Sequence, residues 1–151
     1  MKGPVMALDV GTRRIGVAVS DDDGRMALPL KTLDARSRNE SVRQIIDLAS
    51  QYEVSEIVVG WPLNMQGREG RAVDRVRTLV EALERTKRAQ GMEAVSIRRW
   101  DERLTTVAAD RLLADADVSR RRRKQAVDQV AACKILEGYL ARRRRRVEDE
   151  S

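Results

Sequence analysis

The sequence has 151 residues, of which 42% are hydrophobic and 36% charged, and its formal net charge is +6. This length suits one domain with a single core, and the hydrophobic fraction is too high for a disordered chain. The chain has no histidine and one cysteine, Cys133, which excludes Ser-His-Asp and Cys-His mechanisms, a cysteine zinc site and a disulfide within the chain. Chemistry must come from carboxylates, lysine, hydroxyls or a hard cation, and the positive charge favours nucleic acid as the partner.

The first third of the chain predicts three strands joined by tight turns, which make an antiparallel meander. Val5–Val10 is apolar except for Asp9, and Ile15–Ser20 (IGVAVS) is typical of a second strand. The turn signal Asp21–Gly24 separates this second strand from a third, Met26–Leu33. Asp9 therefore lies in a strand that should be central in the sheet.

The rest of the chain alternates between helical and strand patterns. Helical spacing of apolar residues predicts helices, and short apolar runs predict buried strands. In chain order these are a helix over Asn39–Tyr52, a strand over Glu56–Gly60, a helix over Glu69–Gln90 stopped by Gly91, a strand over Ala94–Trp100, a helix from Thr105 or Thr106 to Ala114, and a helix from Ser119 to Leu140. We expect one domain over residues 1–141 and a charged, disordered tail over residues 142–151.

The element order βββαβαβαα predicts an α/β fold, a mixed five-stranded sheet with helices on both faces. This architecture fits RNase H-like nucleases and also half of an actin-type ATPase domain, so the order of elements does not decide the function.

Three carboxylates stand at positions that chemistry could use. Asp9 shares a strand face with Val5 and Ala7, and it is either a metal ligand or a cap of the Gly11 turn. Glu102 follows the last strand, where open α/β sheets place ligands, but its neighbour Asp101 is an equal candidate from spacing alone.

The third carboxylate, Asp128, begins the apolar stripe of the last helix, although an acid in a first turn can simply interact with the helix dipole. Together such carboxylates suit Mg²⁺ or Mn²⁺ rather than zinc, and with a phosphodiester they can hold two ions about 4 Å apart.

Four segments resemble motifs of the YqgF/RuvX family, in order and over nearly the whole chain. Leu8–Ala18 (LDVGTRRIGVA) resembles the first motif, and Val58–Gly67 (VVGWPLNMQG) resembles the Gly-x-Pro loop. Asp101–Thr106 (DERLTT) is similar to the Asp-Glu-Arg-x-Thr-Thr motif. The C-terminal motif is matched by Lys124, Asp128, Ala131, Ala132, Ile135, Leu136, Tyr139 and Leu140.

The resemblance implies an RNase H-like fold related to Holliday junction resolvases, and a role in maturing the 5′ end of the small-subunit ribosomal RNA precursor. It also implies that Asp9, Glu102 and Asp128 are the catalytic metal ligands, which favours Glu102 over Asp101. The chain departs from the family pattern at Gln129, where a small residue is common, and at Trp61, which is usually aliphatic. Both departures bear on the choice of substrate.

Basic and loop residues provide candidate substrate contacts. A run of five cations over residues 120–124 precedes Asp128 at a helix N-terminus, where phosphate can also bind. Trp61 is a candidate for stacking on an unpaired base, although packing on its own domain is the commoner fate of such a residue. The remaining candidates are Arg14, Arg68, Thr105, Arg121, Arg122, Arg123 and Lys124. A second run, Arg142–Arg146, fits a solvated tail at least as well as a binding role.

Two rival functions stay open. One is a non-catalytic nucleic-acid-binding factor acting in transcription, and the other is an actin-like ATPase fragment, which would need a second duplicated domain. We predict Cys133 to be a small buried hydrophobe, and a homodimer is possible because a junction resolvase must make two symmetric cuts. No signal peptide or membrane-length run is evident, so we expect a cytoplasmic protein.

Overall fold

The computed structural model describes residues 3–104 and 120–150, and for residues 120–127 and 147–150 it describes the backbone alone. The helices are α1 (Arg38–Gln51), α2 (Arg71–Ala89) and α4 (Arg120–Glu150), with a short 3₁₀ turn, η1 (Glu102–Leu104). The strands are β1 (Val5–Val10), β2 (Arg14–Ser20), β3 (Ala27–Asp34), β4 (Glu56–Trp61) and β5 (Ser96–Asp101).

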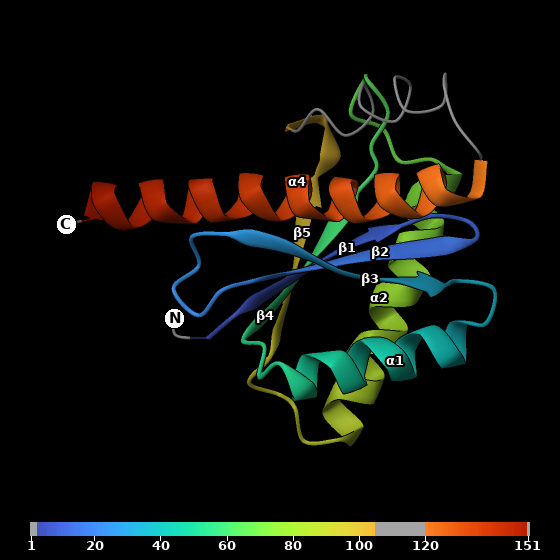
Figure 1. Cartoon of the computed structure of the whole chain (residues 1–151), viewed down its shortest axis with the longest axis horizontal. Coiled ribbons are helices and arrows are strands. Elements are labelled where there is room, and N and C mark those ends of the chain that lie inside the picture. Colours follow the sequence, from blue (N-terminus) through green and yellow to red (C-terminus); the bar gives the residue numbers. More distant parts are fainter. Residues whose placement is uncertain (1–2, 105–119, 151) are drawn as a thin grey trace.

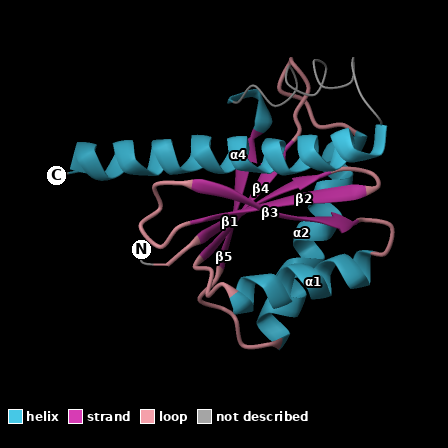
Figure 2. Ribbon diagram, in the orientation of Figure 1, coloured by secondary structure: helices cyan, strands magenta, loops and turns pink. Residues whose placement is uncertain are grey.

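The strands form one mixed sheet in the order β3-β2-β1-β4-β5, with β1 at its centre. β2 is antiparallel to both β1 and β3, whereas β4 is parallel to both β1 and β5. Helices α1 and α2 lie on one side of this sheet, and α4 crosses the other side (Figures 1 and 2). The predicted α/β architecture with helices on both faces is therefore confirmed.

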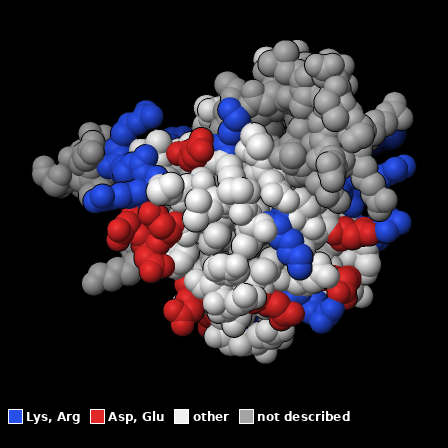
Figure 3. Space-filling model, viewed as in Figure 1, with Lys and Arg blue, Asp and Glu red and all other residues white. Residues whose placement is uncertain are grey.

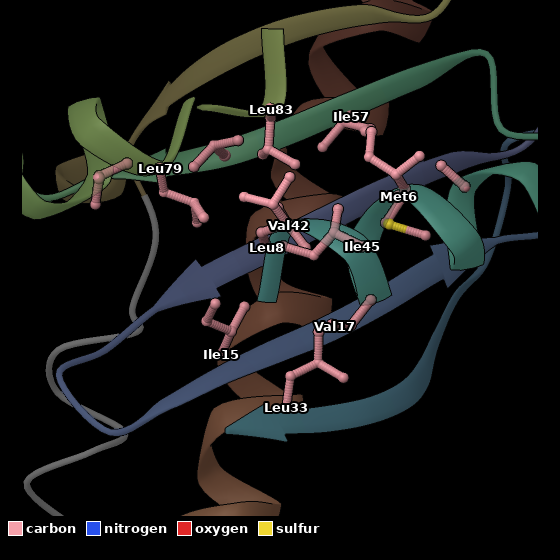
Figure 4. Close-up of a cluster of buried hydrophobic side chains, with 14 of the residues drawn as sticks. Met6, Leu8, Ile15, Val17, Leu33, Val42, Ile45, Ile57, Leu79 and Leu83 are labelled. Carbon is pink, nitrogen blue, oxygen red and sulfur yellow. The ribbon is translucent and has the colours of Figure 1, made fainter. Parts of the chain in front are cut away.

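The face under α1 and α2 carries the larger hydrophobic core. Met6 and Leu8 of β1 point into it, together with Ile57 of β4 and Ile45 of α1, and all four are fully buried. Figure 4 shows these side chains interleaved between the strands and the two helices. Burying each such side chain stabilises the fold by about 1.5–3 kcal/mol, so this layer anchors the sheet.

The face under α4 carries a second, separate cluster. Val5 and Ala7 alternate with Met6 and Leu8 along β1 and pack against Ile135 and Leu136 of α4. Cys133 is half-buried beside this cluster, and burial raises the pKa of its thiol to about 11. The thiol therefore stays protonated at neutral pH, and its half-burial agrees in part with the predicted buried hydrophobe.

Local sequence signals explain where the helices begin and end. Ser37 caps α1, because its side chain accepts a hydrogen bond from the backbone N–H of Glu40. Glu is favoured at this position, three residues after a Ser cap. Gly91, with φ of +70°, stops the chain after α2 in the left-handed region that glycine tolerates best. Within the described ranges, no helix is both long and apolar enough to cross a membrane.

The C-terminal segment differs from the sequence-based expectation. Residues 142–150 continue α4 rather than forming a disordered tail, and the helix ends about ten residues beyond the predicted Leu140. Arg143 forms an ion pair with the buried Glu56, with 3.2 Å between Nη1 and Oε2, and Arg144 donates to the carbonyl of Gly24. Composition suggested a solvated tail because neither partner is near in sequence.

Candidate functional site

Asp9 is a buried carboxylate in the central strand. Only 2% of the residue is exposed, and it follows Val5 and Ala7 on the face that α4 covers. In the antiparallel register of β1 and β2, Asp9 lies directly opposite Gly16. Burying a carboxylate is costly unless charged or hydrogen-bonding groups compensate it, so its surroundings decide what it can do.

Gly16 lets α4 approach the sheet beside Asp9. A Cβ at this position would overlap the carbonyl oxygen of Asp128 and come within 3.1 Å of the Asp128 Cβ. Paired residues of antiparallel strands point to the same face. The structure therefore places Asp128 of α4 directly above the cross-strand neighbour of Asp9.

A second glycine, Gly60, plays the same part on the other side of Asp9. The parallel register pairs Leu8 with Val59, so the next position along sets Asp9 beside Gly60. A Cβ on Gly60 would lie 2.6 Å from Oε1 of Glu102 and 2.8 Å from a methyl group of Ile135. Glu102 therefore extends over β4 towards the same face, where α4 also lies.

The structure separates the roles of Asp101 and Glu102. Asp101 accepts hydrogen bonds from the side chain of Arg103, at 2.6 Å to 3.0 Å, and from its backbone N–H at 3.0 Å. These bonds lower the pKa of the Asp101 carboxyl group, the side-chain pair contributing most. Asp101 is committed to Arg103, whereas the carboxylate of Glu102 turns towards Gly60.

Arg14 contacts a carboxylate, although the sequence suggested a phosphate contact. Its Nε donates to Oδ2 of Asp128 at 3.0 Å, and both side chains are partly buried. Asp9 and Glu102 also have interactions of their own. Across the described residues, no three Asp, Glu or Cys side chains stand close enough to form a ready-made metal site, so Asp9, Glu102 and Asp128 converge on one region without forming a closed ligand set.

The hypothesis that Trp61 stacks on a base does not agree with the structure. Trp61 is only 4% exposed and belongs to the core under α1 and α2. The guanidinium groups of Arg99 and Arg77 lie 4.1 Å and 5.6 Å from the centroid of its ring. The alternation of β4 explains this, because the neighbour of Gly60 must point to the opposite face.

Other predicted contacts divide into exposed loop residues and residues outside the description. Arg68 is exposed in the loop after β4, where its backbone N–H donates to Oδ1 of Asn64. In the same loop Gly67 packs against the guanidinium of Arg103, which brings the loop beside η1. Thr105 lies outside the described residues, as do the side chains of Arg121, Arg122, Arg123 and Lys124.

Sequence reasoning missed a basic pocket next to the first motif. It has a volume of about 230 Å³, borders the turn at Gly11 and Thr12, and contains three arginines, Arg36, Arg38 and Arg75. These residues come from α1, α2 and the loop before α1, so no contiguous charge run revealed them.

The departure from the family pattern at Gln129 also has a structural explanation, because the side chain of Gln129 donates to Oγ1 of Thr32 on β3 at 3.0 Å.

Comparisons with known proteins match nearly the whole chain. A sequence model of the family described as "RuvX: Holliday junction resolvase" matches residues 3–142. A protein of Moorella thermoacetica is 46% identical over 138 residues, covering 91% of this chain and 94% of the relative. One of Myxococcus xanthus is 45% identical over 135 residues, with coverages of 89% and 85%. Both bear the name "Putative pre-16S rRNA nuclease".

Solved structures show the fold independently of close sequence similarity. RuvC of Thermus thermophilus, solved in complex with a Holliday junction substrate, aligns with a TM-score of 0.59 at 12% identity, covering 91% of this chain and 94% of that one. Another T. thermophilus RuvC structure aligns with a TM-score of 0.54 at 13% identity, with coverages of 92% and 95%. With the same fold as these resolvases and a family match over residues 3–142, the chain belongs to the RuvX family of Holliday junction resolvases.

Proposed function

We propose that this chain is a metal-dependent endonuclease that hydrolyses phosphodiester bonds in structured nucleic acid. The observation that carries the proposal is the pair of glycines flanking the buried Asp9. Gly16 lets the backbone of Asp128 approach the sheet on one side of Asp9, and Gly60 leaves room for the carboxylate of Glu102 on the other side. The family assignment supports nuclease chemistry over an ATPase fragment or a non-catalytic factor.

The residues present fit a hard divalent cation. Oxygen ligands from carboxylates suit Mg²⁺ or Mn²⁺, and here three carboxylates come from a strand, a 3₁₀ turn and a helix that meet at Gly16 and Gly60. Asp9, Glu102 and Asp128 would hold the metal, with Asp128 exchanging its bond to Arg14 for the cation. When bound, one or two such ions polarise the phosphate, acidify the attacking water and stabilise the leaving oxygen.

The chain's own residues position this chemistry. β1 fixes Asp9, η1 directs Glu102 over Gly60, and α4 carries Asp128 to Gly16. Arg14 holds the carboxylate of Asp128 on the inner side of α4 and contributes positive charge beside three acids, whose mutual repulsion would otherwise be costly. At the end of β1, Arg38 and Arg75 of the pocket at Gly11 can receive substrate phosphates, whereas Arg36 is bonded to Asp34.

The substrate is a branched or folded nucleic acid. The names of the relatives point to precursor 16S ribosomal RNA, and the family description points to four-way DNA junctions. Two symmetric cuts in a junction would need two copies of the chain, so junction cleavage predicts a homodimer. Light scattering with and without junction DNA measures that state.

The test is cleavage by Asp9→Asn, Glu102→Gln and Asp128→Asn, with Asp101→Asn as the matched control. Labelled four-way junction DNA and a precursor 16S rRNA fragment are incubated side by side with Mg²⁺ or Mn²⁺. We expect each of the three ligand variants to lose more than about 100-fold in rate while remaining folded, because the amide keeps the shape and loses the charge. Asp101→Asn should retain most activity. Near-normal turnover by any ligand variant would remove that residue from the metal site.

A further inference from the structure

A second basic surface lies on the same helix as Asp128, far from the carboxylates. It is a groove of about 590 Å³ between the edge strand β5 and the C-terminal half of α4. One wall includes Arg98 and Arg99, although the guanidinium of Arg99 lies on the ring of Trp61 at the other face of the sheet, and the second wall carries Arg142, Arg143 and Arg146. Figure 3 shows Lys and Arg side chains gathered over the C-terminal half of α4. We call this surface the arginine groove.

The charge of the arginine groove is largely uncompensated. Among the described residues of its lining, Glu56 is the one acid, and it is 2% exposed, bound to Arg143 and to the hydroxyl of Tyr139. Among the side chains that the structure describes, which exclude those of residues 147–150, no carboxylate forms an ion pair with Arg98, Arg142 or Arg146. Holding cations together in this way costs energy unless an anion joins them.

Protection of an exposed sheet edge explains only part of this arrangement. Charged residues on an edge strand prevent pairing with other chains, which accounts for Arg98 and Arg99. It does not account for Arg142 and Arg146, which lie one turn apart on the facing helix. The groove also includes Trp100, whose indole Nε1–H is buried and has no hydrogen-bond partner within the described ranges.

Arginine on both walls selects for phosphate. The guanidinium is always charged and its planar donors match phosphate oxygens in pairs. Arg142 lies about four helical turns after Asp128, or about 21 Å along the axis, and returns to nearly the same side of α4. Duplex nucleic acid advances about 3.4 Å per base pair, so this separation corresponds to roughly six base pairs.

We propose that the arginine groove binds the phosphate backbone of a nucleic acid arm that extends about six base pairs from the cleavage site. The separation in base pairs rests on the proposed function, whereas the binding of nucleic acid by the groove does not. The groove thereby gives the enzyme a minimum arm length, because shorter arms reach the carboxylates but not the arginines.

The test measures binding in EDTA, so that cleavage plays no part. Fluorescence anisotropy follows a labelled four-way DNA junction with arms of about 15 base pairs, for the full chain and for the double variant Arg142→Gln/Arg146→Gln. Each lost phosphate contact should lower the slope of log K against log salt by about 0.9. We therefore expect the slope to fall by nearly 2 and the affinity to fall about tenfold. Arg98→Gln, on the opposite wall, should lower the slope by about half as much.

The matched control is Arg144→Gln/Arg145→Gln, which removes the same charge from the same arginine run outside the groove lining. Circular dichroism checks that all variants keep the helix. If both double variants lose the same affinity for the junction, or if neither loses any, the arginine groove does not bind nucleic acid. Displacement of the junction by micromolar inorganic pyrophosphate would also contradict the proposal, because it would show that the groove is a site for a small phosphorylated ligand.

Junctions with arms of different lengths test the arginine groove separately from the proposed metal site. On a junction with arms of about four base pairs, the unmodified chain and Arg142→Gln/Arg146→Gln should bind equally. A difference that persists on short arms would contradict the six-base-pair path. If the carboxylate variants cleave normally while the groove variants still lose affinity on long arms, the proposed metal site fails and the groove stands.

Discussion

Leu8 and Asp9 are consecutive residues of the central strand, and they point into opposite layers of the molecule. Leu8 enters a core filled by the branched side chains of α1 and α2. Asp9 enters a layer in which the neighbouring strands present glycines, Gly16 and Gly60. The face under α1 and α2 thus gains stability from its large buried side chains. On the face under α4, glycines in place of such side chains allow the carboxylates to lie close to the sheet.

The first prediction concerns the core face. Leu8→Ala should lower the free energy of unfolding by about 2–5 kcal/mol, because it opens a cavity that rigid strands cannot close. Chemical denaturation measures the change. Leu28→Ala is the control, since this β3 leucine is 45% exposed and the same change there should cost little. If the two variants lose equal stability, the α1/α2 layer does not dominate the fold.

The second prediction concerns the glycine face. Gly60→Ala should displace Glu102 and Ile135, lowering stability by about 1–3 kcal/mol and lowering cleavage more than stability alone explains. Gly70→Ala is the control, because a Cβ there meets nothing within 4 Å. Thermal unfolding and cleavage rates are compared for both. Normal activity in a folded Gly60→Ala protein would show that the space above Gly60 serves packing only.

The smallest expected effect is a pH dependence of the free energy of unfolding, which arises from Tyr139 near the C-terminal end of α4. Burial, with a hydrogen bond to Glu56, raises the pKa of Tyr139 to about 12. In the unfolded chain this pKa is about 10, so the folded state holds the proton more tightly. The stabilisation is complete below pH 10 and is lost as pH rises towards 12.

Tyr139→Phe should remove this part of the alkaline loss and should cost about 1 kcal/mol at neutral pH, the value of one hydrogen bond. Denaturation at pH 8 and pH 11 measures the difference between the two proteins. Identical pH profiles for both would show that Tyr139 is not linked to folding.

Much of the molecule could be predicted because its signals are local. The apolar runs of β1 and β2, the stop at Gly91 and the helical spacing in α1 and α2 each depend on residues within a few positions of one another. Asp9 stood out for the same reason, as a charge inside an apolar strand. The choice of Glu102 over Asp101 needed the family resemblance, because spacing alone made the two residues equal candidates, and the structure adds that Asp101 is bonded to Arg103.

Contacts between distant segments could not be predicted in this way. The burial of Trp61 among Arg77 and Arg99, the bond between Arg14 and Asp128, and the anchoring of Arg143 by Glu56 join residues from 16 to 114 positions apart. The residue types at these positions can be read from the sequence, but their partners cannot. A charged residue is solvated or buried according to its partner, and the partner is set by the packing of whole elements.

The sequence by itself determined the five strands, the helices α1 and α2, the mixed sheet and the set of available chemical groups, because periodicity and composition act through neighbouring residues and through burial. The predicted helix from Thr105 or Thr106 to Ala114 lies outside the described residues. Only the tertiary structure decided that Gly16 and Gly60 flank Asp9, that α4 continues over residues 142–150, and that five arginines from two elements line one groove. Each of these depends on which surfaces meet, and the physical reason is that close packing and charge compensation are properties of the assembled layers.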